Sequence, residues 1–323
     1  MWDLLYQMYL RFILLKSELM SIRNVRKLLN TYYDIRQKYY HEHNADVVIV
    51  TPDKMGDLLY LLSFLNGFIR ENEGKKVLVL GNISKELFFT NYRIPQNNTI
   101  LIEDADEWEK LQSLLENRFI FRKAWKENFI FSSPLSLVSF LYVKPWTYIG
   151  LQKKILRLKK STKPAFPIVQ HSYIKSIDNF DQICDRIIVI NQYSNSSRVP
   201  EECFDYLSTI LTNKGYIVYS NVVGAQKAAK CARPLNCSFE ELHEICSRSL
   251  LVISARSGVV DFVLSDVKRM AVIYSSKYWH LAGARRWAKI FNVHEWESDC
   301  DVLEIISNDR EEIFNKIVQH YDL

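Results

Sequence analysis

Short β-branched segments alternate with helical segments along most of this chain, and this alternation constrains the fold more than any other feature. The first such segment covers 46–51 and is followed by a turn with Gly56 and a leucine-rich helical run over 58–69. Further strands are expected at 76–80 and 99–102, with helical signals after them. Buried strands that alternate with helices predict a parallel sheet with helices on both faces.

The same alternation starts again in the second half. Strands are expected at 186–190, 216–219, 249–254 and 269–274, and helices at 200–211, 239–246 and 311–320. Two such series in 323 residues predict two domains, because the length exceeds that of one ordinary domain. We therefore expect an α/β protein with two Rossmann-like halves that face each other across a ligand cleft. The expected parts are an N-terminal helical segment (1–45), a first domain (46–165) and a second domain (166–323).

The composition is that of an ordinary globular protein, with 48% hydrophobic and 24% charged residues. A formal net charge of +5 is too small to indicate nucleic-acid binding. Six cysteines without C-x-x-C spacing argue against a zinc site and a disulfide scaffold. No apolar run reaches the roughly 18 residues of a transmembrane helix, and the N-terminus lacks the pattern of a signal peptide. A cytoplasmic protein is expected.

Two segments leave alternatives open. Residues 1–43 are predicted to be helical and carry many basic side chains, so they either pack on the first domain or lie on an anionic membrane surface. The proline-punctuated region 134–167 is interpreted as the interdomain region. Its basic cluster is either a solvated helix face or a site for an anionic acceptor or lipid headgroups. The cluster consists of Lys153, Lys154, Arg157, Lys159, Lys160 and Lys163.

The turn from Lys54 to Asp57 follows the first strand of the first domain. In open α/β sheets, ligands bind at the carboxyl ends of the strands. Lys54 and Gly56 are therefore expected beside an acceptor molecule. Asp57 begins the following helix, where it either caps the helix or acts as a general base that deprotonates an acceptor hydroxyl.

Three segments at strand ends in the second half carry candidate phosphate-binding groups. The first is the polar loop 191–198, which precedes a helix and is either an anion site or an ordinary capped turn. The second is the turn 254–261, where Arg256 is expected to make a bidentate phosphate contact. The third is the irregular stretch after Asn221, which either holds a nucleotide base or only connects two elements. The candidate residues for these phosphate and base contacts are Ser194, Asn195, Ser196, Arg198, Asn221, Arg256, Ser257, Gly258 and Asp261.

Several other motifs argue against alternative chemistry. The chain has neither a Walker A loop nor a G-x-G-x-x-G fingerprint, which argues against P-loop and NAD chemistry. Asp104 and Asp106 form a D-x-D pair, but their acidic surroundings indicate a solvated loop, so no metal site is expected. His171 and His280 are interpreted as structural. The aromatic and basic stretch 278–287 could line an acceptor site, because aromatic faces pack on sugar rings.

The strand, the turn Met55-Gly56-Asp57 and the leucine-rich helix together resemble the N-terminal motif of heptosyltransferase-type glycosyltransferases, which have the GT-B fold. In that family the aspartate after the glycine is the catalytic base, which implies this role for Asp57. The loop 191–198 and the turn 254–261 are similar to the family's serine-rich loop and diphosphate-binding turn. The Arg-Ser-Gly form of the turn looks more like that of distant bacterial polysaccharide glycosyltransferases. The resemblance spans roughly residues 46–274.

The resemblance implies an inverting, metal-independent transfer of a sugar from a nucleotide-diphosphate sugar. The nucleotide sugar is a co-substrate, and no cofactor is expected. The acceptor would be a hydroxyl of a glycan or lipid-linked molecule in bacterial surface polysaccharide synthesis. The first domain would bind this acceptor and the second the donor, in the cytoplasm or peripherally on the inner face of the membrane. Two alternatives are a membrane-surface binding protein on an inactive GT-B fold and a nucleotide-sugar epimerase.

Overall fold

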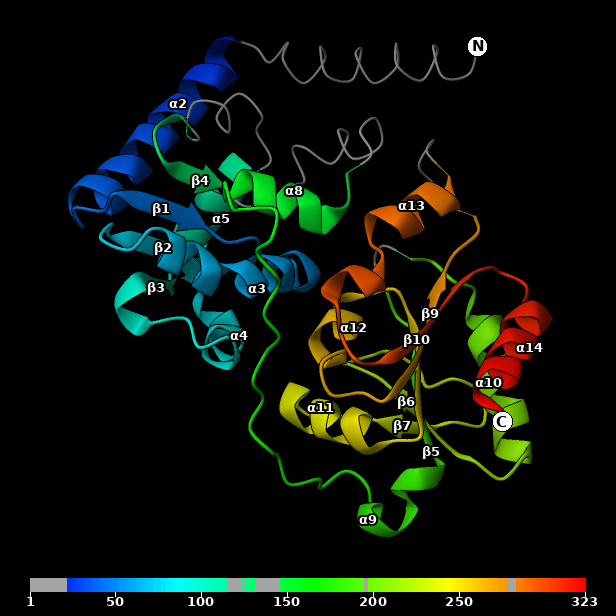
Figure 1. The fold of residues 1–323 in the computed structure, drawn as a ribbon. Coiled ribbons are helices and arrows are strands. Elements are labelled where there is room, and N and C mark those ends of the chain that lie inside the picture. Colours follow the sequence, from blue (N-terminus) through cyan, green and yellow to red (C-terminus); the bar gives the residue numbers. More distant parts are fainter. Residues whose placement is uncertain (1–21, 116–123, 125, 132–145, 195–196, 278–282) are drawn as a thin grey trace, which may run out of the picture. The chain divides into compact units, whose positions relative to one another are not determined.

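The computed structural model describes residues 22–115, 124, 126–131, 146–194, 197–277 and 283–323. The chain divides into two compact units, 1–167 and 168–323. The expected boundary between 165 and 166 lies two residues before the observed one. Each unit is an α/β structure with its own parallel sheet (Figure 1).

The first unit has a four-stranded sheet in the order β3-β2-β1-β4. All its neighbouring strands are parallel. The strands are β1 (Val47–Val50), β2 (Val77–Asn82), β3 (Thr99–Ile102) and β4 (Phe129–Phe131). The helices are α2 (Ile22–Arg36), α3 (Met55–Glu71), α4 (Glu86–Asn91), α5 (Ala105–Leu115) and α8 (Tyr148–Ile155).

The second unit has a six-stranded sheet in the order β10-β9-β8-β5-β6-β7, again with parallel neighbours. The strands are β5 (Ile187–Asn191), β6 (Ile217–Asn221), β7 (Arg233–Leu235), β8 (Leu251–Ala255), β9 (Arg269–Tyr274) and β10 (Asp301–Ile306). The helices are α9 (Phe180–Ile183), α10 (Glu201–Asn213), α11 (Phe239–Arg248), α12 (Gly258–Val263), α13 (Ala284–Ile290) and α14 (Arg310–Tyr321).

Both sheets follow the strand order of a Rossmann fold. Counted within its own unit, the second sheet reads 6-5-4-1-2-3, and the first sheet reads 3-2-1-4. This confirms the two Rossmann-like halves that the sequence predicts. In such a sheet the winding direction reverses between the first and fourth strands. These switch points lie between β1 and β4 in the first unit and between β5 and β8 in the second.

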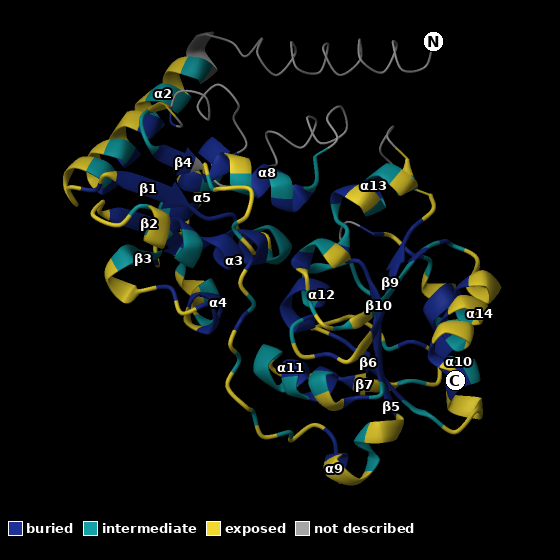
Figure 2. Cartoon of the chain, in the orientation of Figure 1, coloured by how far each residue is buried: buried dark blue, intermediate teal, exposed yellow. Residues whose placement is uncertain are grey.

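Residues on the strands and on the inner helix faces are buried (Figure 2), and most of these buried residues are apolar and form the cores. All four residues of β1 and all five of β8 are buried, as expected for strands that are covered on both faces. In the second unit, α10 and α14 cover one face of the sheet, and α11 and α12 cover the other (Figure 1). In the first unit, α3 packs against α4 and α8. Its buried leucines therefore meet apolar neighbours on more than one side.

The described parts of the N-terminal segment and of the region 134–167 contribute α2 and α8 to the first unit. Helix α2 packs against α5, and the buried Tyr32 hydroxyl donates a hydrogen bond of 2.6 Å to Glu127 Oε2. The interdomain interpretation of 134–167 is wrong for α8, which packs on α3 within the first unit. Residues 1–21 and 132–145 lie outside the described residues. Of the helices described, none is both long enough and apolar enough to cross a membrane.

Candidate functional site

The carboxyl ends of three strands are tied together at the switch point of the second sheet. Asn191 ends β5 and is 3% exposed. Its Nδ2 donates hydrogen bonds to Ser254 Oγ on β8 at 2.9 Å and to Ser257 Oγ at 3.0 Å. Its Oδ1 accepts a 2.9 Å hydrogen bond from Nδ2 of Asn221, which ends β6. A single buried amide therefore fixes three strand ends at the edge where ligands bind in this class of sheet.

Ser257 and Gly258 stand between this network and α12. Ser257 precedes the helix in an extended conformation, and both residues are partly exposed. The Ser257 hydroxyl accepts from Asn191, and its proton has no acceptor among the residues that the structure describes. Asn191 thus orients a hydroxyl group that can still donate a hydrogen bond to a ligand oxygen.

Arg256 differs from the sequence expectation. Its guanidinium makes a bidentate ion pair with Asp261, with distances of 2.9 Å from Nη1 to Oδ2 and 2.7 Å from Nη2 to Oδ1. Its Nε donates to Phe291 O at 3.1 Å, and Nη1 also donates to Ser257 O at 2.8 Å. The arginine side chain is 4% exposed and the aspartate side chain 1%. The bidentate partner is therefore a carboxylate of the same turn, and both side chains fix the turn from within.

The serine-rich loop is also held by internal hydrogen bonds. Ser194 Oγ donates to Arg256 O at 2.6 Å and accepts from Ser197 N at 3.1 Å. Ser197 Oγ in turn accepts from Ser275 N at 3.1 Å. Arg198 is exposed, and no ion pair joins it to another described residue. Asn195 and Ser196 lie outside the described residues. Within the described part of the loop, Arg198 is therefore the cation left for an anionic ligand.

Asp57 lies in the first turn of α3, directly beyond the carboxyl end of β1. The N-cap residue of this helix is Lys54, and no side-chain hydrogen bond caps it, so the interpretation of Asp57 as the cap is wrong. Asp57 Oδ1 instead accepts a hydrogen bond from the hydroxyl of Tyr148, the first residue of α8. Lys54 is exposed, and Gly56 and Asp57 are partly exposed.

Burial raises the pKa of the Asp57 carboxyl above its ordinary value. The hydrogen bond from Tyr148 and the nearby charge of Lys54 act in the opposite direction on that pKa. Burial, followed by the charge of Asp57, raises the pKa of Tyr148 well above its ordinary value, so Tyr148 remains a protonated donor. A carboxylate whose proton affinity is raised toward working pH is suited to general-base chemistry.

The basic cluster is partly engaged by its neighbours. Lys153 Nζ lies 5.7 Å from the ring centroid of Phe64, and Lys154 Nζ lies 3.8 Å from that of Trp146. Arg157 donates a 3.0 Å hydrogen bond to Asn128 Oδ1. The other members, Lys159, Lys160 and Lys163, are exposed. Only Lys153 and Lys154 of this cluster lie on α8, and the other four residues follow the helix, so the expected single helix face is wrong. These contacts favour a solvated surface segment over a preformed acceptor site.

The D-x-D pair and His171 lie on the surface of the described structure. Asp104 Oδ1 accepts a 2.9 Å hydrogen bond from Glu107 N at the start of α5, and both Asp104 and Asp106 are exposed. His171 lies on the surface beside Glu244, at 2.9 Å. Among the described residues, no group of three His, Cys, Asp or Glu side chains is placed to hold a metal ion. His280 and the first half of the stretch 278–287, residues 278–282, lie outside them.

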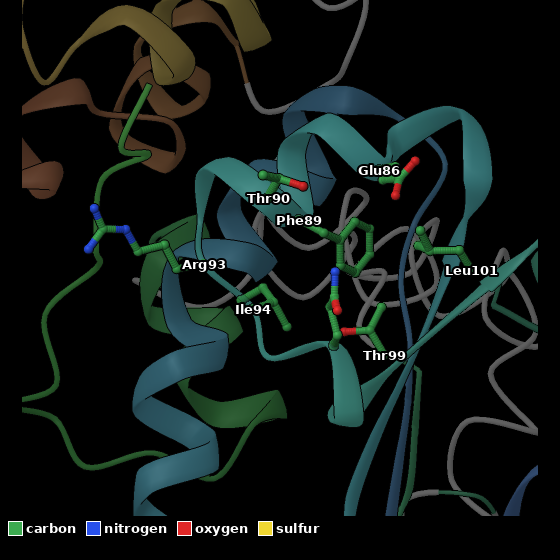
Figure 3. Close-up of a pocket in the computed structure, with 8 residues that line it drawn as sticks. Glu86, Phe89, Thr90, Arg93, Ile94, Thr99 and Leu101 are labelled. Atoms are coloured by element: carbon green, nitrogen blue, oxygen red, sulfur yellow. The ribbon is translucent and has the colours of Figure 1, made fainter. Parts of the chain in front are cut away.

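A surface hollow of about 510 Å³ lies between α4 and the edge strand β3 (Figure 3). Phe89, Ile94 and Leu101 give it an apolar lining, and Glu86, Thr90 and Thr99 add polar groups. None of the residues singled out from the sequence lines this hollow. The predicted chemistry lies instead at the carboxyl ends of β1, β5, β6 and β8.

Comparisons with protein-family profiles and with characterised protein sequences found no match. Solved structures do match. The ADP-heptose lipopolysaccharide heptosyltransferase II of E. coli gives a TM-score of 0.53 at 10% identity, over 85% of this chain and 98% of that one. A family 9 glycosyltransferase from Veillonella parvula gives 0.52 at 12% identity, over 86% and 97%. This chain thus has the GT-B fold of the heptosyltransferase-type glycosyltransferases, as the turn around Asp57 implied.

Proposed function

We propose that this protein is a glycosyltransferase that moves a sugar from a nucleotide-diphosphate sugar to a hydroxyl of a glycan or lipid-linked acceptor. The observation that carries the proposal is Asp57, at the carboxyl edge of the first Rossmann-like sheet, whose carboxyl accepts a hydrogen bond from Tyr148 and has a pKa that burial raises. The fold adds support, because the matched structures over nearly their whole length are glycosyltransferases. Likeness of fold alone would not assign an activity.

In the proposed reaction, Asp57 takes the proton of the acceptor hydroxyl as the acceptor oxygen bonds to the anomeric carbon of the donor sugar. The bond from that carbon to the phosphate oxygen breaks on the opposite face, and the nucleoside diphosphate leaves with the electron pair. Configuration at the anomeric carbon is therefore inverted. Lys54 and Gly56 precede Asp57 on the same turn and would contact the acceptor.

The second unit would stabilise the leaving diphosphate without a required metal. Ser257 supplies a hydroxyl donor that Asn191 orients, and the adjoining backbone of Gly258 adds an N–H group. Arg198, together with Asn195 and Ser196 of the same loop, would contact phosphate oxygens. Preorganised donors and positive charge at a leaving group supply the stabilisation that a metal ion supplies in other enzymes.

Other candidate donor residues take indirect roles in this proposal. Arg256 and Asp261 neutralise each other and keep the Ser257 turn rigid. Asn221 and Ser194 hold the ends of β6 and of the serine-rich loop in place. The network therefore provides the rigidity that a binding site needs from the groups behind its contact residues.

The test of the base is Asp57→Asn, with Asp53→Asn as its matched control. Asp53 is an exposed carboxylate on the same connection, and it accepts a 3.2 Å hydrogen bond from Trp108 Nε1. Release of nucleoside diphosphate from UDP-, GDP-, ADP- and dTDP-sugars would be measured. The Asp57 variant should lose about 10²–10⁴-fold in turnover at similar nucleotide affinity, whereas the Asp53 variant should not. Unchanged turnover in the Asp57 variant would exclude it as the base.

Binding of the donor nucleotide is tested by thermal shift against UDP, GDP, ADP, CMP and dTDP. A cognate nucleotide at a hundred times its dissociation constant stabilises the folded state by about 2.7 kcal/mol. Ser257→Ala should weaken this effect. Epimerisation of the sugar of a nucleotide sugar, without transfer of that sugar to an acceptor, would instead favour the epimerase alternative. Binding to anionic vesicles without any nucleotide binding would favour the membrane-surface alternative. We also propose that the protein acts in bacterial surface polysaccharide synthesis at the inner face of the membrane.

A further inference from the structure

Tyr148 reaches Asp57 from a different part of the first unit. The two residues are 91 positions apart in the sequence, and the tyrosine side chain is buried at 2% exposure. Tyr148 begins α8, whose N-cap residue Thr147 accepts a 3.1 Å hydrogen bond from Gly150 N. Because α8 packs against α3, the two helices bring the hydroxyl and the carboxylate together.

The ring of Tyr148 is fixed on its other sides. Its centroid lies 4.6 Å from that of Tyr60, one helical turn after Asp57 on α3, with an interplanar angle of 60°. Gln152, one turn later on α8 and fully buried, hydrogen-bonds with the Tyr148 hydroxyl. A buried ring held by a neighbouring ring and an amide has little freedom to rotate away.

The hydrogen bond leaves the two carboxylate oxygens of Asp57 in different situations. Oδ1 accepts from Tyr148, whereas Oδ2 has no hydrogen bond from any residue that the structure describes. A carboxylate with one oxygen fixed presents the other in a defined direction, which is the preorganisation that proton abstraction requires.

We propose that Tyr148 is the positioning residue of the catalytic base: its hydroxyl holds Oδ1 of Asp57, so that Oδ2 faces the acceptor hydroxyl, and it stabilises the ionised carboxylate. This proposal rests on the proposed function, in which Asp57 is the base. Tyr148 itself transfers no proton in the reaction. Its effect is exerted through the direction and the ionisation of Asp57.

The described ionisable groups that act on Asp57 are few. They are Tyr148 on α8 and Lys54 at the start of α3, and Tyr60 acts on Tyr148 in turn. Lys54 is exposed, so solvent weakens its effect, whereas the Tyr148 hydroxyl is buried at the carboxylate. Removing this hydroxyl should therefore change the ionisation of Asp57 more than any other single substitution in the described part of the unit.

The test is Tyr148→Phe, with Tyr32→Phe as its matched control. Tyr32 is also a buried tyrosine of the first unit that donates to a carboxylate, Glu127, at 2.6 Å. Both variants lose one buried hydroxyl and its hydrogen bond to a carboxylate, so both report the cost of that loss for folding. Thermal unfolding of each variant verifies that the unit is folded before the other measurements are compared.

The first measurement needs no substrate. The carboxyl carbons of ¹³C-labelled aspartate would be titrated by NMR, with the Asp57 signal assigned from Asp57→Asn. In Tyr148→Phe the Asp57 midpoint should move upward by about one to two pH units, and in Tyr32→Phe it should not move. An unchanged midpoint in a folded Tyr148→Phe protein would overturn the proposal.

The second measurement follows nucleoside diphosphate release from UDP-glucose, GDP-mannose and ADP-glucose over a range of pH. In Tyr148→Phe, the apparent pKa at which kcat falls on the acid side of the pH profile should rise by the same amount. At pH values below that pKa, kcat should therefore be about 10- to 100-fold lower than in the unmodified protein, with little change in KM. A shifted NMR midpoint with an unchanged pH profile would overturn the positioning role. If the unmodified protein releases no nucleotide from any sugar donor, the proposed function is contradicted instead. The NMR titration still tests whether the Tyr148 hydroxyl stabilises the ionised carboxylate of Asp57.

Discussion

Replacing Asp261 with asparagine should destabilise the second unit by about 3–5 kcal/mol, the usual cost of removing one partner of a buried ion pair. The Arg256 side chain is 4% exposed and that of Asp261 1%, so neither charge has water to replace its partner. The other described acceptors of the guanidinium are the carbonyls of Phe291 and Ser257. These carbonyls are neutral, so the variant replaces the carboxylate that pairs with Arg256 by an uncharged amide.

Urea unfolding followed by tryptophan fluorescence measures this loss as a shift of the transition that belongs to the second unit. A loss of 3–5 kcal/mol corresponds to roughly 6–20 °C in the thermal midpoint of a unit of this size. The double variant Arg256→Met with Asp261→Leu should be far less destabilised than either single variant, because it buries no unpaired charge.

The matched control is Lys316→Met. Lys316 Nζ lies 2.6 Å from Glu312 Oε1, but the two side chains are 48% and 46% exposed. An exposed pair of this kind contributes at most about 0.5 kcal/mol despite its short distance. Comparing the two pairs separates the effect of burial from the effect of distance.

A loss below about 1 kcal/mol in Asp261→Asn would refute the reasoning, because it would mean that Arg256 is not held in a dry, carboxylate-dependent position. The arginine would then be available to ligands, and the phosphate contact expected from the sequence would regain support. A retained stability with strongly reduced nucleotide affinity would point the same way.

Two further predictions concern the first unit. Because burial raises the pKa of Asp57 in the folded state, its contribution to stability is present at low pH and is lost as pH rises through that pKa. We therefore expect the thermal midpoint of Asp57→Asn minus that of the unmodified protein to increase between about pH 4 and about pH 8. A difference that stays constant with pH would contradict the raised pKa of Asp57. A Cβ on Gly81 would lie 2.4 Å from Cζ of Phe89, so Gly81→Ala should cost about 1–3 kcal/mol in urea unfolding. Adding Phe89→Leu should recover part of that loss, and no recovery would exclude this contact as the cause.

The sequence predicted the central strands well because they are buried on both faces. The segment expected at 269–274 is β9 to the residue, and the strand expected at 186–190 differs from β5 by one position. The strands that were not predicted are short or lie at an edge. β7 has three residues and includes Pro234, and β4 also has three. β10 lies at the edge of its sheet and includes the charged residues Asp301 and Glu304.

Of the candidate site, the sequence could predict only the residues that lie at or just after the end of a strand. Parallel strands bring their carboxyl ends to one edge, so Asp57, Asn221 and Ser257 could be placed there from the sequence. The partner of Arg256 could not, because local sequence does not say whether a guanidinium points to solvent or folds back onto its own helix. Tyr148 was missed because its contact with Asp57 spans 91 positions, and no periodic pattern connects residues so far apart.

The two units also differ in when they can form during synthesis. Each is a continuous stretch of chain, and the boundary is crossed once, after Pro167. The described strands of the first sheet end with β4, so none of them comes from the later half. At about 5–20 residues per second, the ribosome needs roughly 8–30 s for the remaining 156 residues, far longer than a small α/β unit takes to fold. The unit that carries Asp57 and Tyr148 can therefore reach its folded state while the second unit is still being translated.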